Sequence, residues 1–343
     1  MLAYIVRRLL LLPVVLFGVT LIIFAMIQMV GPYKRLSLYV NDATLAHVRS
    51  SEELVRLVHK YGLDRPIYEQ YAGWLNGVFH GQLGYSPTAH LMVQDALVKY
   101  LPTTAELALF SLIPLVFLAI RLGVFSAVHQ NTIGDHFTRV LAITGWSLPT
   151  FVAGLLLLLF FYKWFPAGRL SVWTIPIVNS PDWHTFTRMY TIDAVLNGNW
   201  RVFLDALRHM VLPIVTLSYI SWALILRITR SSMLETLRQD YVTTARAKGL
   251  PERVVINRHA RRNALIPVAT VAGWTIAGLM GGVVITETIF NYPGLGRFAA
   301  SAALQLDIAA VLGFALFNGL LLVTANLVVD VMYAFIDPRV RLE

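Results

Sequence analysis

The chain has 343 residues and a net charge of +9; 57% of its residues are hydrophobic and only 14% are charged. Soluble domains are about 45–50% apolar and about 25% charged, so this composition predicts a polytopic membrane protein and excludes disordered and collagen-like chains. The absence of cysteine excludes disulfide scaffolds and thiolate sites, and the positive charge indicates basic cytoplasmic loops rather than nucleic-acid binding.

Six stretches are long and apolar enough to cross a bilayer as helices, which takes roughly 20 residues each. The first, Leu9–Val30, is interpreted as a retained anchor helix because no small-residue cleavage site follows it. The other five are expected at about 103–127, 140–162, 210–228, 264–286 and 308–335. Pro114 and Pro149 are expected to kink the second and third of the six helices. The predicted fold is therefore an all-α membrane protein with six transmembrane helices.

Basic residues show which side of the membrane the loops occupy. The loop 229–263 is rich in arginine, Arg7 and Arg8 precede the first helix, and Arg339 and Arg341 end the chain. All of them lie on one face of a six-helix arrangement. The positive-inside rule therefore places this loop and both termini in the cytoplasm.

The outer segment after the first helix is longer than a simple connection requires and predicts two short helices. Ser51 is expected to cap the first, Gly62 to end it and Pro66 to open the second. The segment forms either a lid on the helix bundle or a docking surface for an extracytoplasmic partner. We divide the chain into an anchor helix (1–30), an extracytoplasmic helical segment (31–102) and a five-helix core (103–343) that contains the 229–263 loop.

The cytoplasmic loop predicts two more short helices with a glycine between them. The first is expected at about 233–248, with one apolar face formed by Leu234, Leu237, Tyr241 and Ala245. Gly249 is expected to end it, and Pro251 to begin a second, basic helix that runs to about residue 263. This pair fits insertion into the groove of a partner protein and, equally, attachment to anionic lipid.

At this loop the sequence resembles a known family. The stretch DYVTTARAKGLPERVVINRHARRNALIP (240–267) closely resembles the cytoplasmic signature loop of permeases of ATP-binding-cassette importers, in particular of the dipeptide, oligopeptide and nickel branch. Similar strings follow the family's order: YGLDRPIYEQYAGWL (61–75), GQLGYS (81–86), LPTTAELAL (101–109), SLPTF (147–151), LRHMVLP (207–213), TETIFNYPGLG (286–296) and DPRVR (337–341). The resemblance covers nearly the whole chain. It departs where Gly31-Pro32-Tyr33-Lys34 replaces Pro-Gly-Asp-Pro, and where threonines stand at 243 and 244.

The resemblance implies a type I importer permease fold with an extracytoplasmic helical insertion after the first helix. The chain would be a non-catalytic subunit of the bacterial or archaeal inner membrane, forming half of the pathway for di- or oligopeptides. Its implied partners are a second, related permease in a pseudo-twofold heterodimer, two cytoplasmic ATPases, an extracytoplasmic binding protein and the lipid bilayer. ATP–Mg would bind to the ATPases and no cofactor to this chain, which has no phosphate-loop motif.

Two alternatives concern the substrate and the energy source. Nickel chelates and oligosaccharides are handled by related permeases. A stand-alone secondary transporter is a different class, which usually has duplicated, broken helices and coupling acids at the midplane. We find no such duplication in this sequence.

Two groups of residues are candidate sites. By resemblance, the loop that couples to the ATPases comprises Tyr241, Thr243, Thr244, Ala245, Arg246, Ala247, Lys248, Gly249 and Leu250. We expect Ala245→Arg or Gly249→Pro to uncouple hydrolysis from transport while leaving folding intact. The candidate outer gate or pathway comprises Glu287, Asn291, Pro293, Gly294 and Gly296.

Intramembrane acids are also candidates, because their burial in hydrocarbon is unfavourable unless they have partners. For Glu287 the alternative to a gate role is a structural hydrogen bond to the tight turn that follows it. Glu106 is expected at the outer start of the second helix, in either a capping or a pore role.

Overall fold

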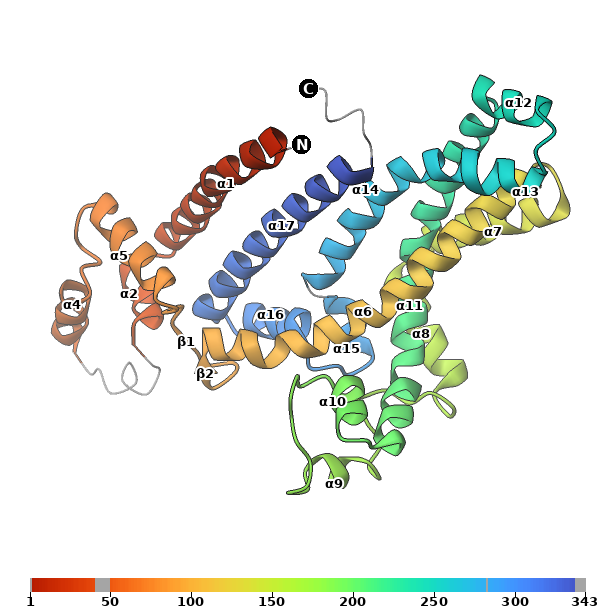
Figure 1. The fold of residues 1–343 in the computed structure, drawn as a ribbon. Helices are drawn as coiled ribbons and strands as arrows, with labels where there is room; N and C mark the ends of the chain where they lie inside the picture. Colours follow the sequence, from red (N-terminus) through yellow and green to blue (C-terminus); the bar gives the residue numbers. More distant parts are fainter. Residues whose placement is uncertain (1, 41–49, 282, 337–343) are drawn as a thin grey trace.

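The computed structural model describes residues 2–40, 50–281 and 283–336, and this part of the chain is almost entirely helical (Figure 1). Its long helices are α1 (Leu2–Met29), α6 (Val93–Val128), α7 (Ile133–Ser147), α8 (Thr150–Phe161), α11 (Trp200–Leu237), α14 (Arg261–Met280) and α17 (Ile308–Ile336). The all-α prediction is confirmed. The string DPRVR at 337–341, with Arg339 and Arg341, lies outside the described residues.

Short elements connect the long helices. They are α2 (Pro32–Arg35), the 3₁₀ helix η1 (Leu36–Leu38), α4 (Ser51–Lys60), α5 (Ile67–Phe79), α9 (Ile175–Val178), α10 (Tyr190–Leu196), α12 (Asp240–Ala247), α13 (Glu252–Val254), the π-helix η2 (Val255–Ala260), α15 (Val284–Ile289) and α16 (Leu295–Leu304). Two strands, β1 (Tyr85–Ser86) and β2 (Leu91–Met92), pair antiparallel with Tyr85 opposite Met92.

The expected number of six spans is not established. Among the described residues, four helical stretches are long and apolar enough to cross a membrane, namely Leu9–Met29, Val93–Val128, Trp200–Tyr219 and Ile308–Val329. The helices α7 and α8 together make a fifth if a pair bent by 107° counts as one span. The helix α14 occupies the position at which the fifth of the six spans was expected.

The prediction of one kinked helix over 140–162 is wrong, because two separate helices occupy this stretch. The helix α7 ends at Ser147, Leu148 is extended with ψ of 119°, and α8 begins after Pro149. A proline disfavours the helical conformation of the residue before it, so Leu148 breaks the helix instead of bending it.

The helices predicted at 103–127 and 210–228 are shorter than those in the structure. The helix α6 starts at Val93 and α11 runs from Trp200 to Leu237, so α11 includes the first turns of the expected cytoplasmic loop. The single helix expected over 233–248 is also wrong, because Gln239 adopts an extended conformation with ψ of 147° and a separate helix, α12, follows it. The continuous helix expected across this break does not form, although Leu234, Leu237 and Ala245 of the predicted face pack in one apolar cluster.

The segment between α1 and α6 contains the two helices expected there. The helix α5 begins after Pro66, as predicted. The cap of α4 is misplaced by one residue in the prediction, because the hydroxyl of Ser50, not Ser51, accepts from the backbone N–H of Glu53 at 3.2 Å. Adjacent serines are equally good caps, so the sequence does not decide between them.

The main hydrophobic core lies between α6, α11 and α14, where Leu107, Leu115, Ile225 and Leu226 are fully or almost fully buried. The helix α1 packs against α17 at the side of this core. The helices α12 and α13 lie at one end of α11, and α9 and α10 lie at the other (Figure 1). The two candidate sites are built on these elements and on α15 and α16.

Candidate functional site

The helix α12 is held by a small apolar cluster at the end of α11. Val242 is fully buried and Ala245 is 5% exposed, and both pack with Met233 of α11 and Ala127 of α6. The phenol of Tyr241 is anchored separately, because the side-chain amide of Asn263 on α14 donates to it at 2.9 Å. The helix therefore rests on the ends of the long helices that carry these residues.

The opposite face of α12 is a solvent-exposed surface. Of the nine residues predicted as the coupling loop, Ala245 is buried and the others are exposed: Tyr241, Thr243, Thr244, Arg246, Ala247, Lys248, Gly249 and Leu250. We call these eight residues the α12 surface. The prediction missed Val242, which together with Ala245 fixes the helix in place. It was missed because the assumed helical face continued through the break at Gln239.

The turn after α12 is a glycine-dependent helix end. Gly249 has φ of +76°, its N–H donates to the carbonyl of Arg246 at 2.9 Å, and the N–H of Leu250 donates to that of Ala245 at 3.4 Å. This is a Schellman motif, in which glycine avoids the strain of a left-handed conformation. Pro251 then precedes α13, so both the predicted stop and the predicted restart are confirmed.

These contacts correct the two variants expected to leave folding intact. A side chain as large as arginine at Ala245 would enter the apolar cluster under α12, where its charge would have no partner. Proline at Gly249 cannot adopt a positive φ. Substitutions that test the surface alone must therefore replace exposed residues such as Thr244 or Ala247.

A bidentate ion pair closes the turn. The guanidinium of Arg246 donates from Nη2 to Oε1 of Glu252 at 2.7 Å and from Nε to Oε2 at 3.1 Å. The hydrogen bonds from Arg246 hold the pKa of the Glu252 carboxyl below its usual value. The pair joins the end of α12 to the start of α13.

We expect this ion pair to add little stability, with a defined dependence on pH. Its side chains are 41% and 54% exposed, which limits its contribution to about 0.5 kcal/mol. Because the pKa of Glu252 is lowered on folding, the contribution is complete above the pKa of the unfolded chain and is lost as pH falls through the folded pKa. Thermal unfolding of the Glu252→Gln variant should differ slightly from wild type at pH 7, and the difference should disappear as the pH falls below the folded pKa of Glu252. Glu52→Gln, at another exposed glutamate, is the control.

The second candidate site is an outer turn built around a buried carboxylate. Glu287 is fully buried. Its Oε1 accepts from the hydroxyl of Thr104 on α6 at 2.7 Å, and its Oε2 accepts from the backbone N–H of Arg297 in α16 at 2.7 Å. Thr104 Oγ1 in turn accepts from the N–H of Leu295 at 2.8 Å. The carboxylate thus satisfies the first turn of α16 and ties it to α6.

The five predicted gate residues are brought into one turn, but they divide into two groups. Gly294 and Gly296 are buried with Glu287, whereas Asn291 and Pro293 are exposed. Asn291 has φ of +56°, and its side-chain oxygen accepts from the guanidinium of Arg297. This geometry favours the structural role for Glu287 and leaves Asn291 and Pro293 as the surface of the turn.

Gly294 should tolerate no side chain. A Cβ there would lie 2.5 Å from Cδ of Glu287 and 2.6 Å from the hydroxyl of Thr104. Gly294→Ala is expected to destabilise the chain by about 2 kcal/mol because the carboxylate must move from its donors. Gly278→Ala on α14 is the matched control, because a Cβ there has no atom within 4 Å. Thermal unfolding of both variants in detergent measures the difference, and equal midpoints would contradict the packing of this turn.

The capping role expected for Glu106 is wrong, because the residue lies well inside α6 and not at its start. Glu106 is 2% exposed, and accepts from Arg169 Nη2 at 2.8 Å and from the N–H and hydroxyl of Thr191, both at 2.7 Å. The guanidinium of Arg169 also lies over the ring of Tyr190, 4.0 Å from its centroid. These contacts therefore attach α10 and the segment between α8 and α9 to α6. The partners of Glu106 are remote in sequence, so no local pattern indicates them.

A second buried ion pair lies beside the cluster that supports α12. Asp135 of α7 is fully buried and accepts from Arg230 of α11 at 2.9 Å through each carboxylate oxygen. Ser126 of α6 donates to the same carboxylate at 2.5 Å. The interaction joins three helices next to Met233 and Ala127. The sequence prediction missed this ion pair, because it counted Arg230 only among the basic residues of the 229–263 loop.

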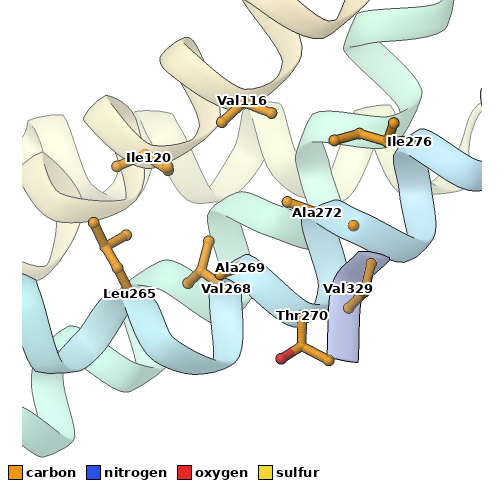
Figure 2. A pocket seen from close by; sticks show the side chains of 10 residues that line it. Val116, Ile120, Leu265, Val268, Ala269, Thr270, Ala272, Ile276 and Val329 are labelled. Carbon is orange, nitrogen blue, oxygen red and sulfur yellow. The ribbon is translucent and has the colours of Figure 1, made fainter. Parts of the chain in front are cut away.

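An apolar cavity lies between α6, α14 and α17. Its volume is about 370 Å³, and Figure 2 shows Val116 and Ile120 of α6 facing Leu265 and Val268 of α14, with Val329 of α17 beside them. None of its lining residues is charged. The cavity therefore offers no counter-ion to a charged solute.

The sequence matches two family models that together cover most of the chain. Residues 119–342 match the model described as "Binding-protein-dependent transport system inner membrane component". Residues 1–108 match "Binding-prot-dependent transport system membrane comp, N-term".

Similar proteins match over most of their own length. The "Probable D,D-dipeptide transport system permease protein DdpB" of Escherichia coli K12 is 40% identical over 86% of this chain and 87% of that protein. The "Dipeptide transport system permease protein DppB" of the same strain is 37% identical over 99% of both chains. The "Oligopeptide transport system permease protein AppB" of Bacillus subtilis is 33% identical over 99% of this chain and 100% of that protein.

Proposed function

Because this chain belongs to the family of binding-protein-dependent transport system inner membrane components, we propose that it forms half of the translocation pathway of an ATP-driven importer for di- or oligopeptides. A second, related permease forms the other half, and an extracytoplasmic binding protein delivers the peptide. Two cytoplasmic ATPases bind ATP–Mg and hydrolyse it. The peptide assignment rests on the names of relatives that are 33–40% identical to the chain.

The observation that carries the coupling role is the construction of α12. One side of this short helix is packed on the ends of α6 and α11 through Val242 and Ala245, and the other side is the exposed α12 surface. A partner that pushed on this surface would move the long helices with it. The basic residues of the loop favour the cytoplasm, where the ATPases are, and the same rule places both termini there.

The outer turn has a different part in this proposal. Its buried members Glu287, Gly294 and Gly296 hold the start of α16 against α6, while Asn291 and Pro293 form its exposed surface. In the proposed topology this surface lies at the entrance of the pathway. It acts as a fixed wall of an outer gate, and the Glu287 carboxylate does not move between partners.

Reconstitution tests the proposal. The chain is purified from its native membrane in mild detergent, its stoichiometric partners are identified, and the complex is placed in liposomes with ATP, the binding protein and a radiolabelled dipeptide. We expect a second permease and an ATPase to co-purify and uptake to require ATP. Uptake of a nickel chelate or an oligosaccharide in place of peptide would overturn the substrate assignment. Uptake by the chain alone, driven by an ion gradient, would overturn the importer assignment in favour of a secondary transporter.

A further inference from the structure

Arg35 is a buried cation that has no acidic partner among the described residues. It lies at the end of α2, and only 5% of the residue is exposed. Its Nη1 donates to the side-chain oxygens of Gln28 and Gln70, both at 2.7 Å. In the part of the chain that the structure describes, the arginines that form ion pairs with acidic side chains are others, such as Arg169 and Arg230.

The neighbours of Arg35 form a complete network of neutral amides. The amide nitrogen of Gln28 donates to Oε1 of Gln70 at 3.0 Å, and the amide nitrogen of Gln70 donates to the carbonyls of Leu63 and Arg65 at 3.1 and 2.6 Å. Both amide oxygens are thereby turned toward the guanidinium. The network fixes the position of Arg35, but it leaves the positive charge uncompensated.

Only Nη2 of the guanidinium is both accessible and without a hydrogen-bond partner among the described residues. Nε is buried and has no hydrogen-bond partner, and Nη2 donates to no described residue. An accessible guanidinium N–H can donate a charge-assisted hydrogen bond to an oxygen of a phosphate or carboxylate. Burial lowers the pKa of Arg35 from its usual value, as expected for a cation held away from anions, yet an arginine stays protonated.

The site is placed at the depth of lipid headgroups. The apolar span of α1 ends at Met29, six residues before Arg35. Trp74 of α5 packs near the same end of α1, with its ring 5.7 Å from that of Phe24, whereas Tyr71 reaches further along the span to Phe17 and Thr20. Tyrosine and tryptophan gather at the boundary between hydrocarbon and headgroups. A phospholipid phosphate is the anion available at this depth.

We propose that Nη2 of Arg35 binds the phosphate of an anionic phospholipid in the leaflet at the Met29 end of α1. The acyl chains of this lipid lie along α1, which is largely uncovered: its spanning segment is 17% buried in the chain. The bound lipid supplies the counter-charge that the amide network lacks. It thereby fixes the junction between α1 and the α2–α5 segment.

Lipid binding to the intact transporter complex tests this proposal. Phosphatidylglycerol is titrated into the delipidated complex, and bound lipid is counted by native mass spectrometry. Arg35→Gln is expected to weaken binding of one lipid by roughly tenfold, because a charge-assisted hydrogen-bonded pair is lost. Arg35→Lys keeps the charge but not the planar guanidinium that the two glutamines orient, and it should bind with intermediate affinity. Arg65→Gln is the control, because Arg65 is exposed and faces Glu69 at 3.9 Å.

Each outcome decides the matter. Competition by inorganic phosphate would support the oxyanion site and would identify a free anion as a second source of the ligand. Equal phosphatidylglycerol binding by wild type and both Arg35 variants would overturn the proposal. Unchanged lipid binding together with lost docking of the binding protein would assign the site to an acidic segment of that protein and would also overturn it. If Arg35→Gln does not fold, the Arg35→Lys comparison decides alone.

Discussion

Replacing Asp135 by alanine is expected to lower the free energy of unfolding of the chain by about 3 kcal/mol, since the charge of Arg230 would remain partly buried without its counter-ion. Asp135 is fully buried, accepts two hydrogen bonds from Arg230 at 2.9 Å, and also accepts from Ser126. The substitution therefore breaks contacts between α6, α7 and α11 together. Thermal unfolding in detergent should show the loss directly.

A double-mutant cycle separates the pair from its surroundings. Arg230→Met alone should also destabilise the chain, and the double variant Asp135→Ala/Arg230→Met should be less destabilised than the sum of the two single changes. Asp182→Ala, at an exposed aspartate, should stay within about 0.5 kcal/mol of wild type. Additive effects of the two single substitutions would show that Asp135 and Arg230 do not act as a pair.

An arginine at Thr244 or Ala247 is expected to reduce peptide uptake by at least about tenfold while leaving the stability of the isolated chain unchanged. Both residues are exposed on α12, so a long cation meets only solvent in the chain alone. In the complex the arginine would prevent a partner from approaching the helix closely. A steric or electrostatic clash at an interface can weaken association by about tenfold or more. ATP hydrolysis and uptake measured on the same proteoliposomes report the loss of coupling.

Ala245→Arg provides the contrast. Ala245 is 5% exposed and lies in the cluster under α12, so this variant should lose stability as well as uptake. If Thr244→Arg and Ala247→Arg transport normally, the α12 surface is not where the ATPases act. If they unfold like Ala245→Arg, the division of α12 into a packed and an exposed side is wrong.

The features that the sequence predicts well are those fixed by neighbouring residues. Gly249 ends α12 with a positive φ, and Pro66 and Pro251 each precede a new helix, because the backbone preferences of glycine and proline act locally. The all-helical membrane fold follows equally from long apolar stretches. The break at Leu148 could have been expected from Pro149, since proline restricts the residue before it.

The features that the sequence does not predict depend on residues far apart in the chain. Glu106 meets Arg169, Asp135 meets Arg230, and Glu287 meets Thr104, and in each case only the folded helices bring the two side chains together. The buried side of α12 was misjudged for a related reason. An apolar pattern gives the face of one helix, but it does not show where the extended Gln239 turns the chain.

Cross-linking from α12 tests the central claim most directly. The chain has no cysteine, so Thr244→Cys introduces a single thiol on the α12 surface and Tyr68→Cys introduces one on the exposed side of α5. In native membranes a short thiol-reactive photo-cross-linker should join position 244 to an ATPase subunit, with a yield that changes on ATP binding, and should not join position 68 to it. Cross-linking of position 244 to lipid alone, or of position 68 to the ATPase, would contradict the account.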